Sequence, residues 1–151
     1  MKETDLAPGL AERIVKVRGR FHPFERIEPE KTALVVIDLQ NIFMAEWSNY
    51  AVADARDVVP NVNRLADALR SRGGTIAWVR MTFDPANPWR TFYEDMIRPE
   101  LAEELKAGFE PGSDGHALWP ALEVAKEDMI LDKTRFSAFL PNSSDIAERL
   151  V

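Results

Sequence analysis

Residues 33–40, Ala-Leu-Val-Val-Ile-Asp-Leu-Gln, decide the fold of this chain. Five consecutive apolar residues, Ala33 to Ile37, show no polar alternation, which is typical of a parallel strand covered on both faces. We therefore predict a strand over residues 31–39. Asp38 follows the apolar run directly, and ligands of open parallel sheets bind at the carboxyl ends of the strands. Asp38 is accordingly either a general base or a turn and helix-cap aspartate.

A helix and a second strand are predicted next along the chain. Apolar residues recur at three- and four-residue intervals over residues 57–72, which predicts an amphipathic helix that ends at Gly73-Gly74. The recurring residues are Val58, Val62, Leu65, Ala66 and Leu69. Residues 75–81, Thr-Ile-Ala-Trp-Val-Arg-Met, then predict a strand. A strand–helix–strand unit of this kind forms a right-handed crossover.

The remaining elements complete an α/β pattern. We expect a short helix over residues 10–17 and helical structure over 91–107 with an interruption at Pro99. A third strand is predicted over 128–131. The last predicted helix is capped by Ser143 or Ser144 and runs into Val151. The order predicts an α/β fold, a three-layer Rossmann-like parallel sheet with about three strands. We expect another segment or chain to complete this sheet, because an open apolar edge needs a cover.

Composition restricts the classes of partner. The 151 residues include 19 basic and 25 acidic side chains, and the net charge of −6 argues against a nucleic-acid or anionic-membrane surface. No run of 18 apolar residues exists, so no membrane span is predicted. Residues 1–5 carry acids and lack an apolar core, so they do not read as a secretory signal, and a cytoplasmic location is the default expectation. The absence of cysteine excludes disulfides and thiolate–metal sites.

A second informative segment, residues 129–139, reads Met-Ile-Leu-Asp-Lys-Thr-Arg-Phe-Ser-Ala-Phe. By itself, a lysine such as Lys133 after a short strand is usually exposed and inert. However, the strings Asp-Leu-Gln-Asn-Ile-Phe (38–43) and Lys-Thr-Arg-Phe-Ser-Ala-Phe (133–139), with 95 residues from Asp38 to Lys133, resemble the isochorismatase-like cysteine hydrolases. The resemblance covers residues 31–151, as the N-terminal part of a single α/β domain of that family. Residues 1–30 form a lead-in.

This resemblance implies catalytic roles for Asp38 and Lys133. In the family the aspartate takes the proton of a cysteine thiol, and the lysine lies close to both groups and favours their anionic states. The thiolate attacks a carbonyl, and water hydrolyses the covalent acyl-enzyme. The implied function is a hydrolase of a small-molecule substrate that cleaves a non-peptide C–N bond, amide or ureido, or a vinyl ether. The nucleophile is expected from a complementary Cys-bearing segment or chain.

A second interpretation makes the chain a cysteine-less, catalytically inactive binding or assembly module with the same fold. The absence of cysteine favours it, whereas the retention of both Asp38 and Lys133 argues against it. A Rossmann-like nucleotide binder is disfavoured, because the residues after Ile37 provide no glycine-rich phosphate cradle. In the first two interpretations the open sheet edge predicts a homo-oligomer rather than a free monomer.

Aromatic residues near the two motifs are candidates for substrate contacts. Aromatic walls with one charged group suit a small planar amide or enol ether, although aromatic residues are also enriched at oligomer interfaces. The candidate substrate-binding residues are Gln40, Phe43, Trp47, Trp89, Phe136, Ser137 and Phe139. Arg80 and Arg135 would either bind a substrate carboxylate or form surface salt bridges. His22 and His116 are isolated, so no metal site and no other cofactor are predicted.

Overall fold

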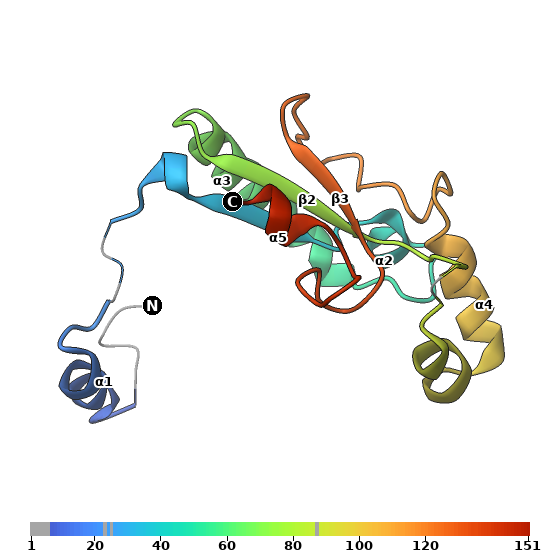
Figure 1. Ribbon diagram of the computed structural model, residues 1–151, viewed down its shortest axis with the longest axis horizontal. Helices are drawn as coiled ribbons and strands as arrows, with labels where there is room; N and C mark the ends of the chain where they lie inside the picture. Colours follow the sequence, from blue (N-terminus) through green and yellow to red (C-terminus); the bar gives the residue numbers. More distant parts are fainter. Residues whose placement is uncertain (1–6, 23, 25, 87) are drawn as a thin grey trace.

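A three-stranded parallel sheet forms the centre of the molecule (Figure 1). The computed structural model describes residues 7–22, 24, 26–86 and 88–151. Its strands are β1 (Ala33–Ile37), β2 (Thr75–Met81) and β3 (Met129–Lys133), in the order β1-β2-β3. Both pairings are parallel, which confirms the predicted α/β fold. The third strand runs past the predicted 128–131, so Asp132 and Lys133 belong to the strand rather than to the loop after it.

Helix α3 (Val59–Arg70) covers one face of this sheet. Its Ala66 packs in a buried cluster with Val36 of β1 and Trp78 of β2, and burial of these side chains holds the helix on the sheet. The helix predicted over 57–72 is an α-helix only from Val59 onwards, and a 3-10 turn, Ala53–Val58, precedes it. Pro60 lies in the first α-helical turn, where its missing N–H has no intrahelical partner to lose.

The opposite face of the sheet is only partly covered. Val79 and Leu131 pack against Ala138 and against Ile146 of α5 (Ile146–Arg149). Ile37, the last residue of β1, is nevertheless 49% exposed. Among the described residues no strand pairs with the outer edge of β1. The sheet therefore has an apolar edge strand, β1, whose outer edge is unpaired and whose second face is only partly covered by this part of the chain.

The long segment between β2 and β3 builds a separate apolar cluster beyond the strand ends. It contains a π-helical turn, Thr91–Met96, and α4 (Pro99–Gly108). The helical structure is thus interrupted directly before Pro99, which begins α4, rather than at Pro99 itself. A short helix that was not predicted, α2 (Asn41–Met44), packs on this segment through Ile42. A larger residue at position 108 would force the Ile42 side chain to move, since a Cβ atom there would lie 2.0 Å from the Ile42 Cδ1 atom.

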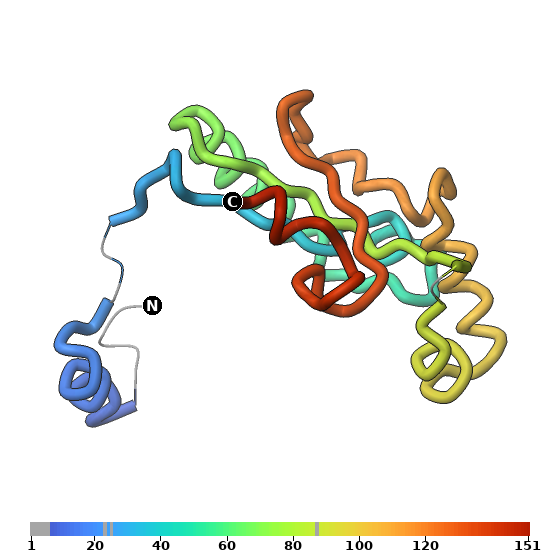
Figure 2. The backbone as a smooth tube through the Cα atoms, viewed as in Figure 1, coloured from blue at the N-terminus to red at the C-terminus, as the bar shows by residue number. Residues whose placement is uncertain are grey.

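The two ends of the chain carry short helices. α1 (Leu10–Arg18) agrees with the helix predicted over 10–17, lies apart from the sheet and has no buried residue (Figure 2). The last helix is a single turn that ends at Arg149, and its N-cap residue is Asp145 rather than the predicted Ser143 or Ser144. The Ser144 Oγ atom nevertheless accepts the Ile146 N–H over 3.2 Å. The prediction about a secretory signal concerns residues 1–5, which lie outside the described residues. None of the described helices is long and apolar enough to cross a membrane.

Candidate active site

Asp38 and Lys133 meet at the carboxyl ends of the strands. Asp38 follows β1, whereas Lys133 is the last residue of β3 and reaches across the end of β2. The Lys133 Nζ group donates to Asp38 Oδ2 over 2.9 Å and to the Phe136 carbonyl oxygen over 3.1 Å, and it lies 3.8 Å from the Met81 Sδ atom. Two of the three N–H donors of the ammonium group thus have oxygen acceptors, and the thioether sulfur is only a weak acceptor for the third. The Lys133 side chain is 2% exposed and that of Asp38 is 33% exposed.

The backbone turns sharply at Asp38. Its φ angle is 62°, in the left-handed region, which aspartate adopts more readily than most residues. Such a conformation costs roughly 1–3 kcal/mol and is found preferentially at functional sites. The Asp38 N–H still donates to the Val79 carbonyl oxygen over 2.9 Å, so the pairing of β1 with β2 continues up to the turn. The strained turn thus directs the carboxylate out of the strand at the point where Lys133 reaches it.

The carboxylate of Asp38 differs from an ordinary surface aspartate in its pKa and in its hydrogen bonding. Burial raises its pKa, and the hydrogen bond and charge of Lys133 oppose that rise without cancelling it. Oδ2 is engaged by Lys133, whereas Oδ1 is buried and has no hydrogen-bond partner among the described residues. Because Oδ1 is unpartnered and the pKa is raised, this carboxylate accepts a proton more readily than an ordinary aspartate.

An apolar cavity of about 330 Å³ lies beside this pair. Its walls include four phenylalanines that form two ring pairs, Phe43 with Phe109 at 5.6 Å between centroids and Phe92 with Phe136 at 5.1 Å. The rest of the lining, apart from Asp38 and Lys133, consists of Tyr50, Met81, Ile97 and Leu105. Small-molecule sites are typically of this kind, apolar with a few placed polar groups. The cavity therefore has the character of a small-molecule site in which Asp38 and Lys133 are the charged lining residues.

Gln40 holds the loops around the cavity together. Its side chain is fully buried, and its Nε2 donates to the carbonyl oxygens of Met81, over 3.0 Å, and His116, over 3.1 Å. Its Oε1 accepts the Met81 N–H over 2.6 Å. Each polar atom of the amide is thus bonded to the main chain. Gln40 does not line the cavity, and the structure places it as a residue that positions the ends of β1 and β2.

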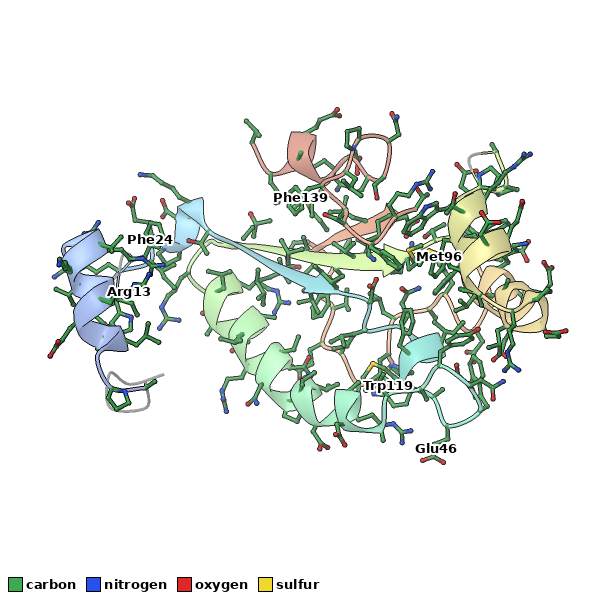
Figure 3. All side chains as sticks on the ribbon, turned by 90° about the horizontal axis from the view of Figure 1, so that it is seen from below. Arg13, Phe24, Glu46, Met96, Trp119 and Phe139 are labelled. Atoms are coloured by element: carbon green, nitrogen blue, oxygen red, sulfur yellow. The ribbon has the colours of Figure 1, made fainter. Side chains whose placement is uncertain are left out.

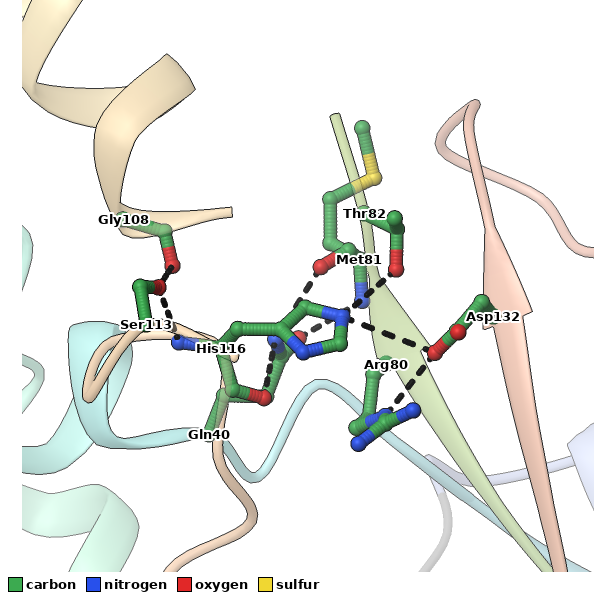
Figure 4. A network of polar contacts seen from close by, with 8 residues as sticks. All are labelled: Gln40, Arg80, Met81, Thr82, Gly108, Ser113, His116 and Asp132. Carbon is green, nitrogen blue, oxygen red and sulfur yellow. Dashed lines mark hydrogen bonds and ion pairs between the residues drawn. The ribbon is translucent and has the colours of Figure 1, made fainter. Parts of the chain in front are cut away.

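A buried histidine braces the ends of β2 and β3 (Figure 4). The His116 Nε2 atom lies 2.7 Å from Thr82 Oγ1 and 3.6 Å from Asp132 Oδ1, and Asp132 also accepts from Arg80 Nε over 2.8 Å. Burial alone would raise the pKa of Asp132, but the neighbouring His116 ring and the hydrogen bond and charge of Arg80 lower it to about 2. Arg80 is thereby engaged in a salt bridge, one of its two expected roles. Within the described ranges, no group of three or more His, Asp or Glu side chains could hold a metal ion.

The other predicted substrate-binding residues divide into two groups. Phe43 and Phe136 line the cavity, and Trp89 buttresses one wall by stacking on Phe92 at 4.9 Å and packing edge-on against Phe136 at 4.5 Å. Trp47 and Phe139 are each 57% exposed and do not line this cavity.

Phe139 and Ser137 lie in the turn after β3, and Phe139 is on the side of the sheet opposite α3 (Figure 3). The Ser137 Oγ atom accepts the Phe139 N–H over 3.2 Å and so stabilises this turn. A substrate contact for Trp47, Ser137 or Phe139 stays a prediction.

Most of the cavity wall was not predicted from the sequence. Phe92, Ile97, Leu105 and Phe109 belong to the segment between β2 and β3, and Tyr50 lies in the loop after α2. The only signal for them in the sequence is the frequency of apolar residues over 92–109, which equally indicates ordinary core packing. The fold brings them to the site because this segment packs over the ends of β1 and β2.

Replacing Lys133 by methionine is expected to raise the pKa of Asp38 further. The hydrogen bond and charge of Lys133 are the contributions that lower this pKa, so their loss leaves burial unopposed. The side-chain carboxyl ¹³C shift of Asp38, followed by NMR through a pH titration of both proteins, measures the change. A fall in the pKa, or no change, would mean that the two groups are not coupled. Lys126→Met, at an exposed position, is the matched control.

The sequence is similar to one protein family and to several curated proteins. The family described as the isochorismatase domain matches residues 32–150. A probable inactive nicotinamidase from Arabidopsis thaliana is 35% identical over 109 residues, which cover 72% of this chain and 54% of that protein. The ureidoacrylate amidohydrolase of Rhizobium rhizogenes is 25% identical over 159 aligned positions, covering 92% of this chain and 62% of that enzyme. The chain thus spans little more than half the length of these curated relatives.

Solved structures agree with the fold. A cysteine hydrolase from Pseudomonas syringae pv. phaseolicola superimposes with a TM-score of 0.67 at 22% identity, over 85% of this chain and 58% of that one. The nicotinamidase of Bacillus subtilis gives a TM-score of 0.59 at 23% identity, over 80% of this chain and 64% of that one. At these identities the likeness shows a shared architecture of the sheet and its helices.

Proposed function

The chain belongs to the isochorismatase family of hydrolases, and from this membership we propose that it is the Asp- and Lys-bearing part of an enzyme that cleaves a small non-peptide C–N bond. The observation that carries the proposal is the ion pair of Asp38 and Lys133, 2.9 Å between Oδ2 and Nζ, beside an apolar cavity. Two of the relatives are named as an amidohydrolase and a nicotinamidase, which favours an amide or ureido substrate over a vinyl ether.

In the proposed reaction Asp38 Oδ1 takes the proton of a cysteine thiol. The thiolate sulfur forms a bond to the substrate carbonyl carbon, the C–N bond breaks, and the leaving nitrogen receives the proton from Asp38. Water then attacks the thioester, and the C–S bond breaks to release the acid and restore the thiol. Lys133 holds the carboxylate in place and offsets its negative charge throughout.

The cysteine is proposed to come from sequence outside these residues, since none of the 151 is a cysteine. The relatives support this, because 54% and 62% of their lengths are matched and each has a further part without counterpart here. We call this chain together with that Cys-bearing segment or chain the completed enzyme. The uncovered edge of β1 is the proposed place of attachment, and it is also the reason to expect an oligomeric assembly.

A second candidate function is a cysteine-less binding or assembly module with the same fold. The lack of cysteine favours it, and so does the relative that is named as probably inactive. A module of this kind would keep the cavity and bind a small molecule without turning it over.

The intact mass of the purified functional protein, measured under denaturing conditions, separates the two functions. The hydrolase proposal expects a second polypeptide, or a mass well above 17.1 kDa, together with hydrolysis of small amides. A single species at 17.1 kDa that binds but does not hydrolyse amides would support the binding module instead. Amide hydrolysis by that single species would overturn the cysteine mechanism.

A further inference from the structure

The two charged residues of the site come from strands that are not neighbours. Asp38 follows β1 and Lys133 ends β3, and β2 lies between these two strands. The distance of 2.9 Å between Asp38 Oδ2 and Lys133 Nζ therefore depends on how the ends of β1 and β3 are held relative to each other. A hydrogen bond of this length weakens when its atoms move apart by a few tenths of an ångström.

The main chain around His116 is bonded to the loop that follows β1. Gln40, two residues after Asp38, forms an antiparallel bridge with Leu118. The Gln40 Nε2 atom also donates to the His116 carbonyl oxygen over 3.1 Å. The His116 N–H donates to Ser113 Oγ over 3.2 Å, so the main chain is held on both sides of the residue. These contacts fix the position of His116 relative to the turn at Asp38.

The side chain of His116 reaches the strand end that carries Lys133. Its Nε2 atom lies 2.7 Å from Thr82 Oγ1 and 3.6 Å from Asp132 Oδ1 (Figure 4). The Thr82 N–H in turn donates to the Lys133 carbonyl oxygen over 2.8 Å. Asp132 directly precedes Lys133, and successive side chains of a strand point to opposite faces. The imidazole therefore contacts the end of β3 from the face opposite the Lys133 side chain.

This link between the two strand ends is buried. His116 is 3% exposed and Thr82 is 8% exposed. Buried polar atoms are nearly always hydrogen-bonded, and a lost partner leaves the other atom with an uncompensated desolvation cost. The contact of the imidazole with Thr82 is therefore expected to persist in the folded chain and to restrict movement of the strand ends.

From these contacts we propose that His116 is a positioning residue, which holds the end of β3 against the loop after β1 and thereby sets the distance between Asp38 and Lys133. It rests on the proposed function only in taking this pair as the catalytic one. It goes beyond that function by assigning a role to a residue that does not line the cavity and acts through Thr82 and the main chain of Lys133.

Replacing His116 by phenylalanine tests the proposal, because the ring is kept and the nitrogen next to Thr82 is lost. The hydrogen bond and charge of Lys133 lower the pKa of Asp38, so a looser pair is expected to raise that pKa. Titration of the Asp38 carboxyl ¹³C shift in the 151-residue chain measures it, with circular dichroism as the check of folding. In the completed enzyme kcat should fall about 10²-fold with little change in KM.

His116→Gln separates positioning from simple packing. Its amide can place an N–H group close to the position of the imidazole Nε2, so the pKa of Asp38 should return towards the wild-type value. An equal rise in the phenylalanine and glutamine variants would overturn the proposal, because ring packing rather than the polar contact would then matter. His22→Phe makes the same change at an exposed position and should leave the pKa of Asp38 unchanged.

An unchanged pKa of Asp38 in folded His116→Phe would also overturn the proposal. If that variant does not fold, Thr82→Val decides, since it removes the hydroxyl partner and keeps the shape of the side chain. The pKa of Asp38 should rise in Thr82→Val as well, and an unchanged value would reject the role of His116.

Failure here can be distinguished from failure of the proposed hydrolase. A raised pKa of Asp38 in His116→Phe, together with normal turnover in Asp38→Asn, would support the positioning role and reject the hydrolase mechanism. An unchanged pKa in His116→Phe, together with lost turnover in Asp38→Asn, would reject the positioning role alone.

Discussion

In the completed enzyme, changing Asp38 to asparagine is expected to lower kcat by about 10²–10⁴-fold, the range typical of a lost general acid–base group. Asparagine keeps the size of the side chain and tolerates the positive φ that the turn requires, so the fold is expected to persist. It cannot take the thiol proton. Steady-state kinetics with a small amide, alongside circular dichroism, measure both expectations. Lys133→Ala should also reduce turnover strongly, because it releases the carboxylate that Lys133 holds.

Asp67→Asn is the matched control for this experiment. It makes the same chemical change at an exposed position of α3, remote from the cavity, and activity should stay within about twofold. Near-normal turnover in Asp38→Asn would sink the assignment of Asp38 as the base. A loss of helical signal in that variant would instead assign Asp38 a structural role.

The largest effect on stability is expected from Asp128→Ala, at the position directly before β3. The Asp128 side chain is 1% exposed and accepts hydrogen bonds from the Arg70 guanidinium, over 2.9 and 2.7 Å, from Trp78 Nε1 and from the Ala125 N–H. Removing one partner of a buried pair leaves the others unsatisfied. We expect the free energy of unfolding to fall by about 3–5 kcal/mol, measured by urea denaturation of the chain.

Acid should weaken the same contacts in the wild-type chain. Burial alone would raise the pKa of Asp128, but the hydrogen bonds from Arg70, Trp78 and Ala125 lower it below the ordinary value of 3.8. A carboxyl with a lowered folded-state pKa stabilises the protein above pH 3.8, and that stabilisation is lost as the pH falls below it.

The Asp128→Asn variant should show a shallower loss of stability below pH 4 than the wild type, because it has no carboxyl to protonate at this position. Glu127→Ala, at the exposed neighbouring position, should change the free energy of unfolding by less than about 0.5 kcal/mol. A similar small change in Asp128→Ala would show that the contacts of Asp128 contribute little.

The parts of this structure that follow from local sequence were predictable. The unbroken apolar run of β1 and the apolar residues of Thr75–Met81 placed two strands within a few residues. The contact between Asp38 and Lys133 was implied by the resemblance to the isochorismatase-like hydrolases, and the parallel strand ends that share one edge of the sheet account for it. The end of β3 was set too early, because Asp132 and Lys133 are polar. Their pairing with Arg80 and Asp38 is what allows them to continue the strand.

Features that depend on distant packing could not be predicted. Gln40 was expected to contact substrate, but its amide is bonded to the main chain of Met81 and His116, which approach it only in the folded protein. The cavity wall comes largely from Phe92 to Phe109, whose apolar side chains look the same in sequence whether they fill a core or line a site. The spacing of apolar residues in the sequence predicts that such side chains are buried, but it does not predict which of them line a cavity.

The outer edge of β1 has a geometric consequence for how activity arises. Neighbouring strands lie about 4.8 Å apart, so a parallel strand added at this edge would end one strand spacing from Asp38. Whatever extends the sheet therefore delivers its own loop to the carboxylate in the same step. Completion of the sheet and formation of the active site would then occur together. The fraction of active molecules would equal the fraction of molecules whose sheet is complete.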